Sequence, residues 1–430
     1  MSEMITPLKS LAGIVDIPGD KSISHRTVML AGLAATPVRV TNFLSAADCW
    51  STVSCMRALG VQVQHTGENE LLIKGNGLYG LTEPSDILDA GNSGTTTRLL
   101  TGILAGQPFF TILTGDKSIR HRPMARVITP LTKMGCQIYG RDHSRYAPLA
   151  IVPSEGIHGI EYTMPVPSAQ VKSAILLAGM FADGPTVIHE PLMSRDHSER
   201  MLQAFGVDVK RKGLTITLNP VSELTAPPVI DVPGDISSAA FWLVAATIIP
   251  GSKLRLRNVG INPSRTGVID VLLQMGANIT TYNHRLAGQE PVADITVESA
   301  ELTATTVEGE IVPRLVDEIP VLAVAALFAK GTTVFKGAEE LRVKETDRLK
   351  AIALELGKMG ARITEAADGL VIEGPQTLTP ACCDAHDDHR MAMALAVAGM
   401  AAKGVEITGA ECINISYPHF FTEIQALRID

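Results

Sequence analysis

The sequence predicts an α/β fold of two similar lobes, each made of three βαβαββ units that bury parallel helices and place their sheets outside, an inside-out α/β barrel. Three observations support this prediction. A loop, helix and strand theme recurs along the 430 residues. The helices of that theme are apolar nearly all round, which is typical of fully buried helices. A Pro-Gly-Asp turn occurs twice, at places where the chain could pass from one lobe to the other.

The first theme is a small or polar loop, an Ala-rich helix, a Gly or Pro turn and a short β-type run. Self-similarity of this kind indicates a repeated structural unit. A unit of this size cannot cover both faces of its helices alone, so we expect several units to pack together. The copies occupy residues 20–43, 92–115, 168–190, 235–259, 317–337 and 387–409.

A second theme lies between copies of the first. In it, a helix ends in a hydrophobic residue and a Gly and then leads into a strand. Gly just after a last helical turn suits the left-handed C′ position. A plain succession of α/β units is the alternative, but the fully apolar helices favour a ring of helices inside an outer layer of sheet. The second theme occurs at 58–63, 133–138, 204–209, 274–279 and 358–363, and no sixth copy is evident.

Two similar stretches, VDIPGDKSIS at 15–24 and IDVPGDISSA at 230–239, are candidate crossovers between lobes. Pro fixes φ and Gly relaxes it, which suits a turn or hinge. If both stretches are crossovers, residues 20–232 form one lobe, and residues 1–19 and 233–430 form the second. Two lobes joined in this way could close over a ligand bound in the cleft between them.

Composition excludes several classes of protein. The chain is 46% hydrophobic and carries a formal charge of −8, which disfavours nucleic-acid binding. Its longest apolar runs, near 319–329 and 391–402, are shorter than the roughly 18 residues of a membrane span. Asp16 and Pro18 interrupt any signal-peptide core near the N-terminus. The six cysteines have no metal-ligand spacing, so we expect reduced thiols and a cytoplasmic protein.

Helix starts in the first theme gather cations and small polar residues. The free N–H groups of a helix start attract anions, and cations beside them strengthen that attraction. Any single Ser or Asn there could be a plain N-cap, and any single Lys or Arg a solvated charge. The recurrence at equivalent places favours anion binding. The cations are Lys21, Arg26, Arg98, Lys117, Arg122, Lys172, Arg195 and Arg390; the small residues are Ser22, Ser24, Asn92, Ser93, Gly94 and Ser168.

Two further segments are dense in charge. In ELRVKETDRLK at 340–350, Lys344 and Arg348 are predicted to share one helical face, for which a salt-bridged surface helix is the alternative. DAHDDHR at 384–390 contains Asp387, Asp388 and His389. Because adjacent residues rarely bind one metal together, we expect no metal there.

The motifs GDKSISHR, GNSGTTTRLLTG, IRHRPM, PSAQVKSA, LRVKETDRL and DDHRMAM, in this order and spacing, resemble the 5-enolpyruvylshikimate-3-phosphate (EPSP) synthase family of enolpyruvyl transferases. The resemblance runs from about residue 7 to the end. It implies two lobes of three βαβαββ units each. It also implies transfer of the enolpyruvyl group of phosphoenolpyruvate to the 5-hydroxyl of shikimate 3-phosphate by a tetrahedral addition–elimination, with release of phosphate.

The resemblance places this reaction in chorismate and aromatic amino acid biosynthesis, with glyphosate as an inhibitor. It implies no metal and no cofactor, and we expect a monomer. Both substrates are polyanions, which explains cations concentrated locally on an acidic chain. The only partners expected are these two small-molecule substrates, with no nucleic acid and no membrane.

Site roles follow from the resemblance residue by residue. Asp317 would be the base at the 5-hydroxyl, Glu345 would take part in proton transfer at the methylene carbon, and Lys21 would touch both substrates. The shikimate 3-phosphate set is Lys21, Ser22, Arg26, Ser168, Ala169, Gln170, Arg195, Asp317 and Lys344. The phosphoenolpyruvate set is Lys21, Asn92, Gly94, Arg122, Gln170, Arg348, His389 and Arg390.

The sequence departs from the family pattern in two places. NISYPHFF at 414–421 has no lysine where some members have one, and residue 340 is Glu where some members have Asn. Lys117, the counterpart of Lys21 in the second octapeptide, has no role implied by the family.

Two rival functions fit less well. UDP-N-acetylglucosamine enolpyruvyl transferases place a reactive Cys near the arginine that matches Arg122, and residues 115–124 contain none. A non-catalytic phosphate-binding repeat protein would not need Asp317, Lys344 and Glu345 together with the arginines.

Overall fold

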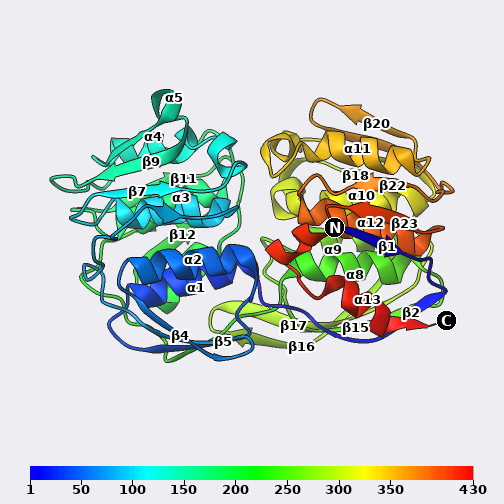
Figure 1. The fold of residues 1–430 in the computed structure, drawn as a ribbon, viewed down its shortest axis with the longest axis horizontal. Helices are drawn as coiled ribbons and strands as arrows, with labels where there is room; N and C mark the ends of the chain where they lie inside the picture. Colours follow the sequence, from blue (N-terminus) through cyan, green and yellow to red (C-terminus); the bar gives the residue numbers. More distant parts are fainter. Residues whose placement is uncertain (430) are drawn as a thin grey trace. The chain divides into compact units, whose positions relative to one another are not determined.

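The computed structural model describes residues 1–429, which divide into two compact units. The Lys21 unit contains Gly19–Pro233 and Leu286–Glu290, and the Asp317 unit contains Met1–Pro18, Gly234–Arg285 and the chain from Pro291 onward. Figure 1 draws the Lys21 unit mainly in blue to green and the Asp317 unit mainly in green to red. The predicted α/β class is confirmed, because helices and mixed sheets alternate along the whole chain.

Three buried helices form the centre of the Lys21 unit. Nearly every residue in them is buried, and their Leu, Ala, Val and Ile side chains belong to one continuous hydrophobic core. The central helices are α1 (Lys21–Gly32), α3 (Gly94–Leu104) and α6 (Ala169–Gly179); the others are α2 (Ala47–Ala58), α4 (Ala125–Lys133), α5 (Arg141–Ser144), α7 (His197–Ala204) and the 3-10 helix η1 (Ile119–His121).

The sheets of the Lys21 unit repeat one topology three times. Each has four strands, with one parallel pair followed by two antiparallel pairs. The sheets are β14 (Val229–Asp231), β3 (Val38–Thr41), β5 (Glu70–Lys74) and β4 (Gln62–Gly67); β6 (Leu88–Asp89), β7 (Thr111–Thr114), β9 (Tyr146–Val152) and β8 (Gln137–Gly140); and β10 (Glu161–Thr163), β11 (Thr186–His189), β13 (Thr215–Leu218) and β12 (Val209–Lys212). The central helices contact these sheets directly, α1 against β5, α3 against β7 and α6 against β11.

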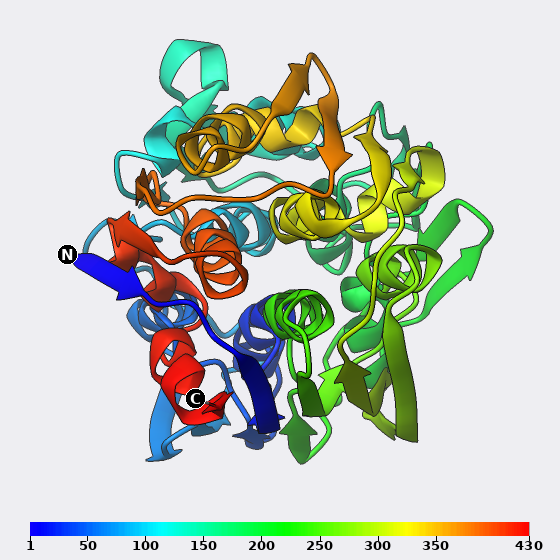
Figure 2. The same ribbon diagram turned by 90° about the vertical axis from the view of Figure 1, so that its right-hand side faces the viewer.

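The Asp317 unit is built in the same way. Its central helices are viewed nearly end-on in Figure 2, in green, yellow and orange-red, with strands toward the outside of the unit. They are α8 (Ile236–Ile248), α10 (Ile319–Phe328) and α12 (His389–Ala401). The others are α9 (Gly267–Gln274), α11 (Arg348–Lys358), α13 (Phe420–Leu427) and the 3-10 helices η2 (Gly309–Arg314), η3 (Val316–Glu318), η4 (Glu339–Val343) and η5 (Ala410–Ile415).

The two ends of the chain complete the sheets of the Asp317 unit. β1 (Ser2–Ile5) pairs with β23 (Val405–Thr408), and β24 (Arg428–Ile429) pairs with β2 (Ser10–Asp16). β22 (Cys382–Asp384) completes the first of these sheets, and β15 (Lys253–Gly260), β17 (Glu290–Glu298) and β16 (Asn278–Ala287) complete the second. The third sheet is β18 (Thr306–Val307), β19 (Gly331–Phe335), β21 (Gly369–Gly374) and β20 (Ile363–Ala366).

The glycines of the second theme have the left-handed backbone that the sequence predicts. Gly60, Gly135, Gly206, Gly276 and Gly360 have φ of 94°, 93°, 84°, 99° and 89°. Each follows the end of a helix and precedes a strand. The last helix, α13, leads directly into β24 without such a glycine, which is why no sixth copy is visible in the sequence.

Three short stretches differ from the predicted domain boundaries. The sequence-based boundaries place Gly19, Pro233 and Leu286–Glu290 in the second lobe, but they belong to the Lys21 unit. The last of these is the tip of the β16–β17 hairpin. Its Glu290 carboxylate lies 2.7 Å from Nδ1 of His197, and Arg200 donates to the Gln289 carbonyl at 2.9 Å. A polar hairpin tip has no hydrophobic pattern that would reveal these partners in the sequence.

Among residues 1–429, no helix has the length and apolarity needed to cross a membrane.

Candidate active site

Side chains cap five of the six central helices. Asp20, Ser93, Ser168, Asp235 and Asp388 each accept a hydrogen bond from a backbone N–H of the first turn. Ser93 and Ser168 therefore act as N-caps of α3 and α6. α10 is the exception, because it begins with Pro320 in its first turn and has no side-chain cap from the described part of the chain. The capped starts hold most of the residues for which the sequence predicts a role.

Lys21 and Arg26 lie in the first turns of α1. The Lys21 ammonium is 3.2 Å from Oδ2 of Asp48 on α2. Arg26 is buried and donates to Oγ of Ser198 at 2.8 Å and Oγ of Ser173 at 2.7 Å. It also donates to the carbonyl of Ser22 at 2.9 Å. Burial lowers the pKa of Arg26 to about 10, so it stays charged at neutral pH, and its partners fix its orientation.

Gly94 begins α3 against two guanidinium groups. A Cβ at this position would lie 2.9 Å from Nη1 of Arg98 and 2.9 Å from Nη1 of Arg122. Only glycine lets both arginines approach the helix start this closely. Beside it, Asn92 donates to Asp116 at 2.7 Å. The first turn of α3 therefore carries concentrated positive charge.

The start of α6 is joined to the start of α3. Gln170 accepts from Nη1 of Arg98 at 2.6 Å and donates to Oγ1 of Thr95 at 3.2 Å. Ser168 caps α6, and Ala169 is its first residue. Arg195 lies half-buried just before α7.

Lys172 and Lys117 differ in their surroundings from the other predicted helix-start cations. Lys172 is fully buried and pairs with Glu199 at 2.8 Å and Glu190 at 3.2 Å, so it cannot serve an external anion. Lys117 is exposed.

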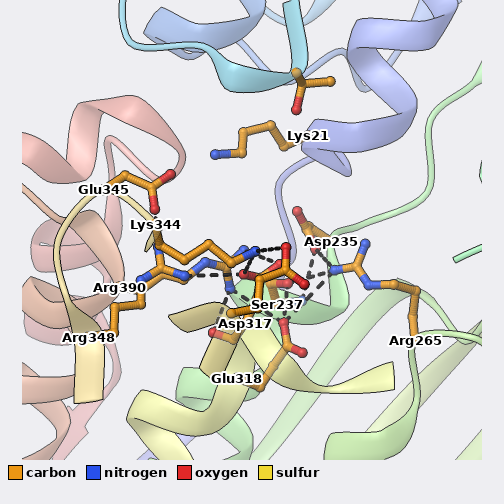
Figure 3. A network of polar contacts seen from close by, with 12 residues as sticks. Lys21, Asp235, Ser237, Arg265, Asp317, Glu318, Lys344, Glu345, Arg348 and Arg390 are labelled. Carbon is orange, nitrogen blue, oxygen red and sulfur yellow. Dashed lines mark hydrogen bonds and ion pairs between the residues drawn. The ribbon is translucent and has the colours of Figure 1, made fainter. Parts of the chain in front are cut away.

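In the Asp317 unit, Asp317 is surrounded by cations, as Figure 3 shows. Its Oδ1 lies 3.1 Å from Nη1 of Arg348 and 3.4 Å from Nζ of Lys344. Nη2 of Arg390 lies 3.9 Å from Oδ2. η3 carries Asp317 directly ahead of α10. The predicted base and three predicted substrate-binding cations thus form one cluster.

Arg348 is the most constrained of these cations. Its side chain is only 1% exposed, and it donates to Asp388 at 2.7 Å and to Glu345 at 2.6 Å in addition to Asp317. Burial alone would lower the pKa of Arg348, but the surrounding carboxylates raise it above its ordinary value. The guanidinium is therefore permanently charged and already bound to protein carboxylates.

Lys344 and Arg348 do not share one helical face, which corrects the sequence-based expectation. Lys344 follows the 3-10 helix η4, and α11 begins only at Arg348 because the Asp347 side chain caps it. The break lets both cations reach Asp317. Lys344 also lies 3.5 Å from Glu340, the residue that departs from the family pattern.

A second layer of polar residues, for which the sequence predicts no role, holds Arg390. Arg390 Nη1 donates to the Asp317 carbonyl at 3.1 Å and lies 3.4 Å from Oε1 of buried Glu318. Ser237 donates to the same Glu318 oxygen and accepts from Arg265 at 2.6 Å (Figure 3). The one indication of this layer in the sequence is that Glu318 directly follows Asp317. His389 is buried in the first turn of α12.

Comparison with known proteins identifies the family. Residues 5–424 match the family described as EPSP synthase (3-phosphoshikimate 1-carboxyvinyltransferase). The chain belongs to the EPSP synthase family. It is accordingly an enzyme, a carboxyvinyltransferase of aromatic biosynthesis, as the resemblance in its motifs predicts.

Individual relatives of the EPSP synthase family match along the full length. A 3-phosphoshikimate 1-carboxyvinyltransferase of Desulforudis audaxviator is 54% identical over 431 residues and covers 100% of both chains. One from Thermosynechococcus vestitus is 54% identical over 97% of this chain and 95% of its own. The EPSP synthase structure of Acinetobacter baumannii superposes with a TM-score of 0.88 at 42% identity, covering 99% of this chain and 98% of that one.

The enolpyruvyl transferase NikO of Streptomyces tendae has a TM-score of 0.80 at 18% identity, covering 99% and 96% of the two chains. This likeness shows a shared fold.

Proposed function

We propose that this enzyme transfers the enolpyruvyl group of phosphoenolpyruvate to the 5-hydroxyl of shikimate 3-phosphate through a tetrahedral intermediate and releases phosphate. The observation that carries the proposal is the cluster of Asp317, Lys344, Glu345 and Arg348, in which two carboxylates and two cations meet within 3.4 Å contacts. The matching relatives bear the name of this activity. A protein that merely bound phosphate would not need carboxylates among its cations.

Asp317 is assigned as the base that accepts the proton of the 5-hydroxyl. A general base must lie within hydrogen-bond reach of the proton it takes. Lys344 and Arg348 hold Oδ1, so we assign the hydroxyl to Oδ2, which lies 3.9 Å from Nη2 of Arg390. The fixed cations orient the carboxylate before the substrate arrives.

Glu345 is assigned to proton transfer at the methylene carbon of phosphoenolpyruvate. Its Oε2 now binds Nη2 of Arg348 at 2.6 Å. We propose that the donor's carboxylate competes with Glu345 for this guanidinium, because a planar carboxylate suits the same donors. Binding of the donor would then release the Glu345 carboxyl group for its catalytic role.

The remaining assignments divide by substrate. We propose that Lys21, Ser22, Arg26, Ser168, Ala169, Gln170, Arg195 and Lys344 hold shikimate 3-phosphate, and that Lys21, Asn92, Gly94, Arg122, Gln170, Arg390 and His389 line the phosphoenolpyruvate site. These sets draw on both units, so the proposal requires that residues of both act on one pair of substrates. We also propose a cytoplasmic, monomeric enzyme without cofactor or metal.

Phosphate release tests the function. Purified protein and phosphoenolpyruvate would be incubated with shikimate 3-phosphate, with UDP-N-acetylglucosamine, or with no acceptor. We expect release only with shikimate 3-phosphate. Release that is equal with the nucleotide sugar, or that needs no acceptor, would overturn the proposal.

A further inference from the structure

Helices α1 and α2 are joined by two rungs of matching spacing. Lys21 and His25 lie four residues apart on α1, and Asp48 and Thr52 lie four residues apart on α2, so each pair occupies one helical face. Lys21 Nζ is 3.2 Å from Oδ2 of Asp48, and His25 Nδ1 is 2.6 Å from Oγ1 of Thr52. The first rung holds a predicted substrate-binding cation, whereas the second has no role in the proposed reaction.

The second rung continues into α3. Oγ1 of Thr52 lies 2.6 Å from Oγ1 of Thr96, and the Thr96 hydroxyl donates to Oγ of Ser93 at 2.7 Å. Ser93 is the N-cap of α3 and also accepts from the Thr96 backbone N–H at 3.0 Å. His25, Thr52, Thr96 and Ser93 are all 0% exposed. A buried chain of side-chain hydrogen bonds therefore crosses three helices.

This chain of hydrogen bonds has one direction. The Thr96 hydroxyl gives its only proton to Ser93, so it must accept from Thr52, and Thr52 must then accept from Nδ1–H of His25. Burial, with Lys21 and Arg26 nearby, lowers the pKa of His25 well below 6.5, so the ring is neutral. A neutral ring that donates from Nδ1 carries no hydrogen on Nε2, which has no hydrogen-bond partner within residues 1–429. In this arrangement the hydroxyls of Thr52 and Thr96 each accept one of these hydrogen bonds and donate the next.

We propose that Thr52 is a positioning residue, which fixes the Asn92–Gly94 turn at the start of α3 relative to the Lys21–Arg26 turn at the start of α1. The inference rests on the proposed function, in which one turn serves the donor and the other the acceptor. Reaction between two bound substrates requires their reacting atoms to be held at a defined separation, and small displacements are costly. Thr52 is suited to this task because its single hydroxyl bonds to both neighbouring helices.

Other threonines of α3 provide a matched comparison. Thr97 and Thr101 donate to the carbonyls of Ser93 and Thr97, four residues earlier in the chain, at 2.9 Å and 2.7 Å. Both are as buried as Thr52. Loss of such a hydroxyl alters one helix locally without uncoupling two of them.

The experiment compares Thr52→Val, Thr52→Ser and the control Thr101→Val. Valine keeps the shape of threonine and removes the hydroxyl. We expect kcat/KM for phosphoenolpyruvate to fall about tenfold or more in Thr52→Val, to recover in Thr52→Ser, and to stay near wild type in Thr101→Val. The Tm of each variant reports any general loss of stability.

A double-mutant cycle isolates the coupling. If Thr52 and Thr96 act through one hydrogen bond, Thr52→Val with Thr96→Val should lose little more activity than the worse single variant. Additive losses, or equal kcat/KM for Thr52→Val and Thr101→Val, would overturn the positioning role.

Hydrogen exchange separates this inference from the proposed function. If wild type releases no phosphate, the proposed function fails, but exchange at the Thr96 amide still tests the linkage. We expect this amide to exchange faster in Thr52→Val than in Thr101→Val. Equal exchange in the two variants would show that Thr52 does not hold the start of α3.

Discussion

Lys21 and Lys117 show how the surroundings of a side chain, rather than its local sequence, decide its role. They occupy the same position in the octapeptides GDKSISHR and GDKSIRHR. Lys21 lies in the first turn of a buried helix and pairs with buried Asp48, whereas Lys117 is exposed. The octapeptide alone could not distinguish them, because the following residues form a long helix in one case and a short 3-10 turn in the other.

Lys21→Met should nearly abolish turnover and weaken the binding of both substrates. The variant removes the ammonium proposed to lie between two anions and leaves the buried Asp48 carboxylate without this cation. Lys117→Met is the matched control and should keep wild-type activity. Initial rates and titration calorimetry measure the effect. A Lys21→Met enzyme that retains more than about a tenth of the wild-type rate would refute the assignment.

Asp317→Asn should lower kcat by about 100-fold or more while changing substrate affinity much less. The amide keeps the shape of the carboxylate but cannot accept the proton. Asp270→Asn, which alters an exposed pair with Arg314, is the control. Rapid-quench kinetics and calorimetry give rate and affinity separately. Parallel loss of both would mean that Asp317 only orients Lys344 and Arg348.

Gly94→Ala should raise the inhibition constant of glyphosate far more than the KM for phosphoenolpyruvate. The new methyl must displace the guanidinium ends of Arg98 and Arg122 into the neighbouring space. A longer ligand has less room for such a shift than the natural donor. Inhibition curves at fixed shikimate 3-phosphate measure it, with Gly357→Ala as control. Equal sensitivity of Gly94→Ala and wild type would remove Asn92 and Gly94 from the donor site.

At the scale of elements, the sequence was most informative where one physical requirement governs a position. The six buried helices follow from unbroken apolar composition, and the five helix-ending glycines from the need for positive φ. Tertiary pairing could not be predicted in this way. β1 completes a sheet with β23 from the opposite end of the chain, and no local pattern in either strand specifies that partner.

Helix α11 provides a test of the glycine argument. Gly357 lies inside the helix, and a Cβ added there would point into open space, whereas Gly360 has φ of 89° just beyond the helix end. Gly357→Ala should stabilise the protein by about 0.5–1 kcal/mol. Gly360→Ala should destabilise it by about 1–2 kcal/mol. Chemical unfolding followed by circular dichroism compares the two, and shifts of the same sign would contradict the account of this helix end.

At the scale of the whole molecule, the sequence named the members of the proposed catalytic cluster but not the residues that support them. LRVKETDRL and DDHRMAM supply Arg348 and Arg390, and both reach Asp317. Glu318, Ser237 and Arg265, which hold Arg390, lie in three separate segments and are brought together only by tertiary packing. Buried polar networks of this kind depend on tertiary geometry, which residue types and spacing do not encode locally.

The central proposal is that residues of both units act on one pair of substrates. A crystal structure with shikimate 3-phosphate and a non-reactive analogue of phosphoenolpyruvate tests it most directly. We expect shikimate 3-phosphate to contact Ser168 and Arg195, its 5-hydroxyl to lie within hydrogen-bond distance of Asp317, and the analogue to contact Arg122 and Arg390. If either ligand contacted residues of only one unit, that result would contradict the proposal.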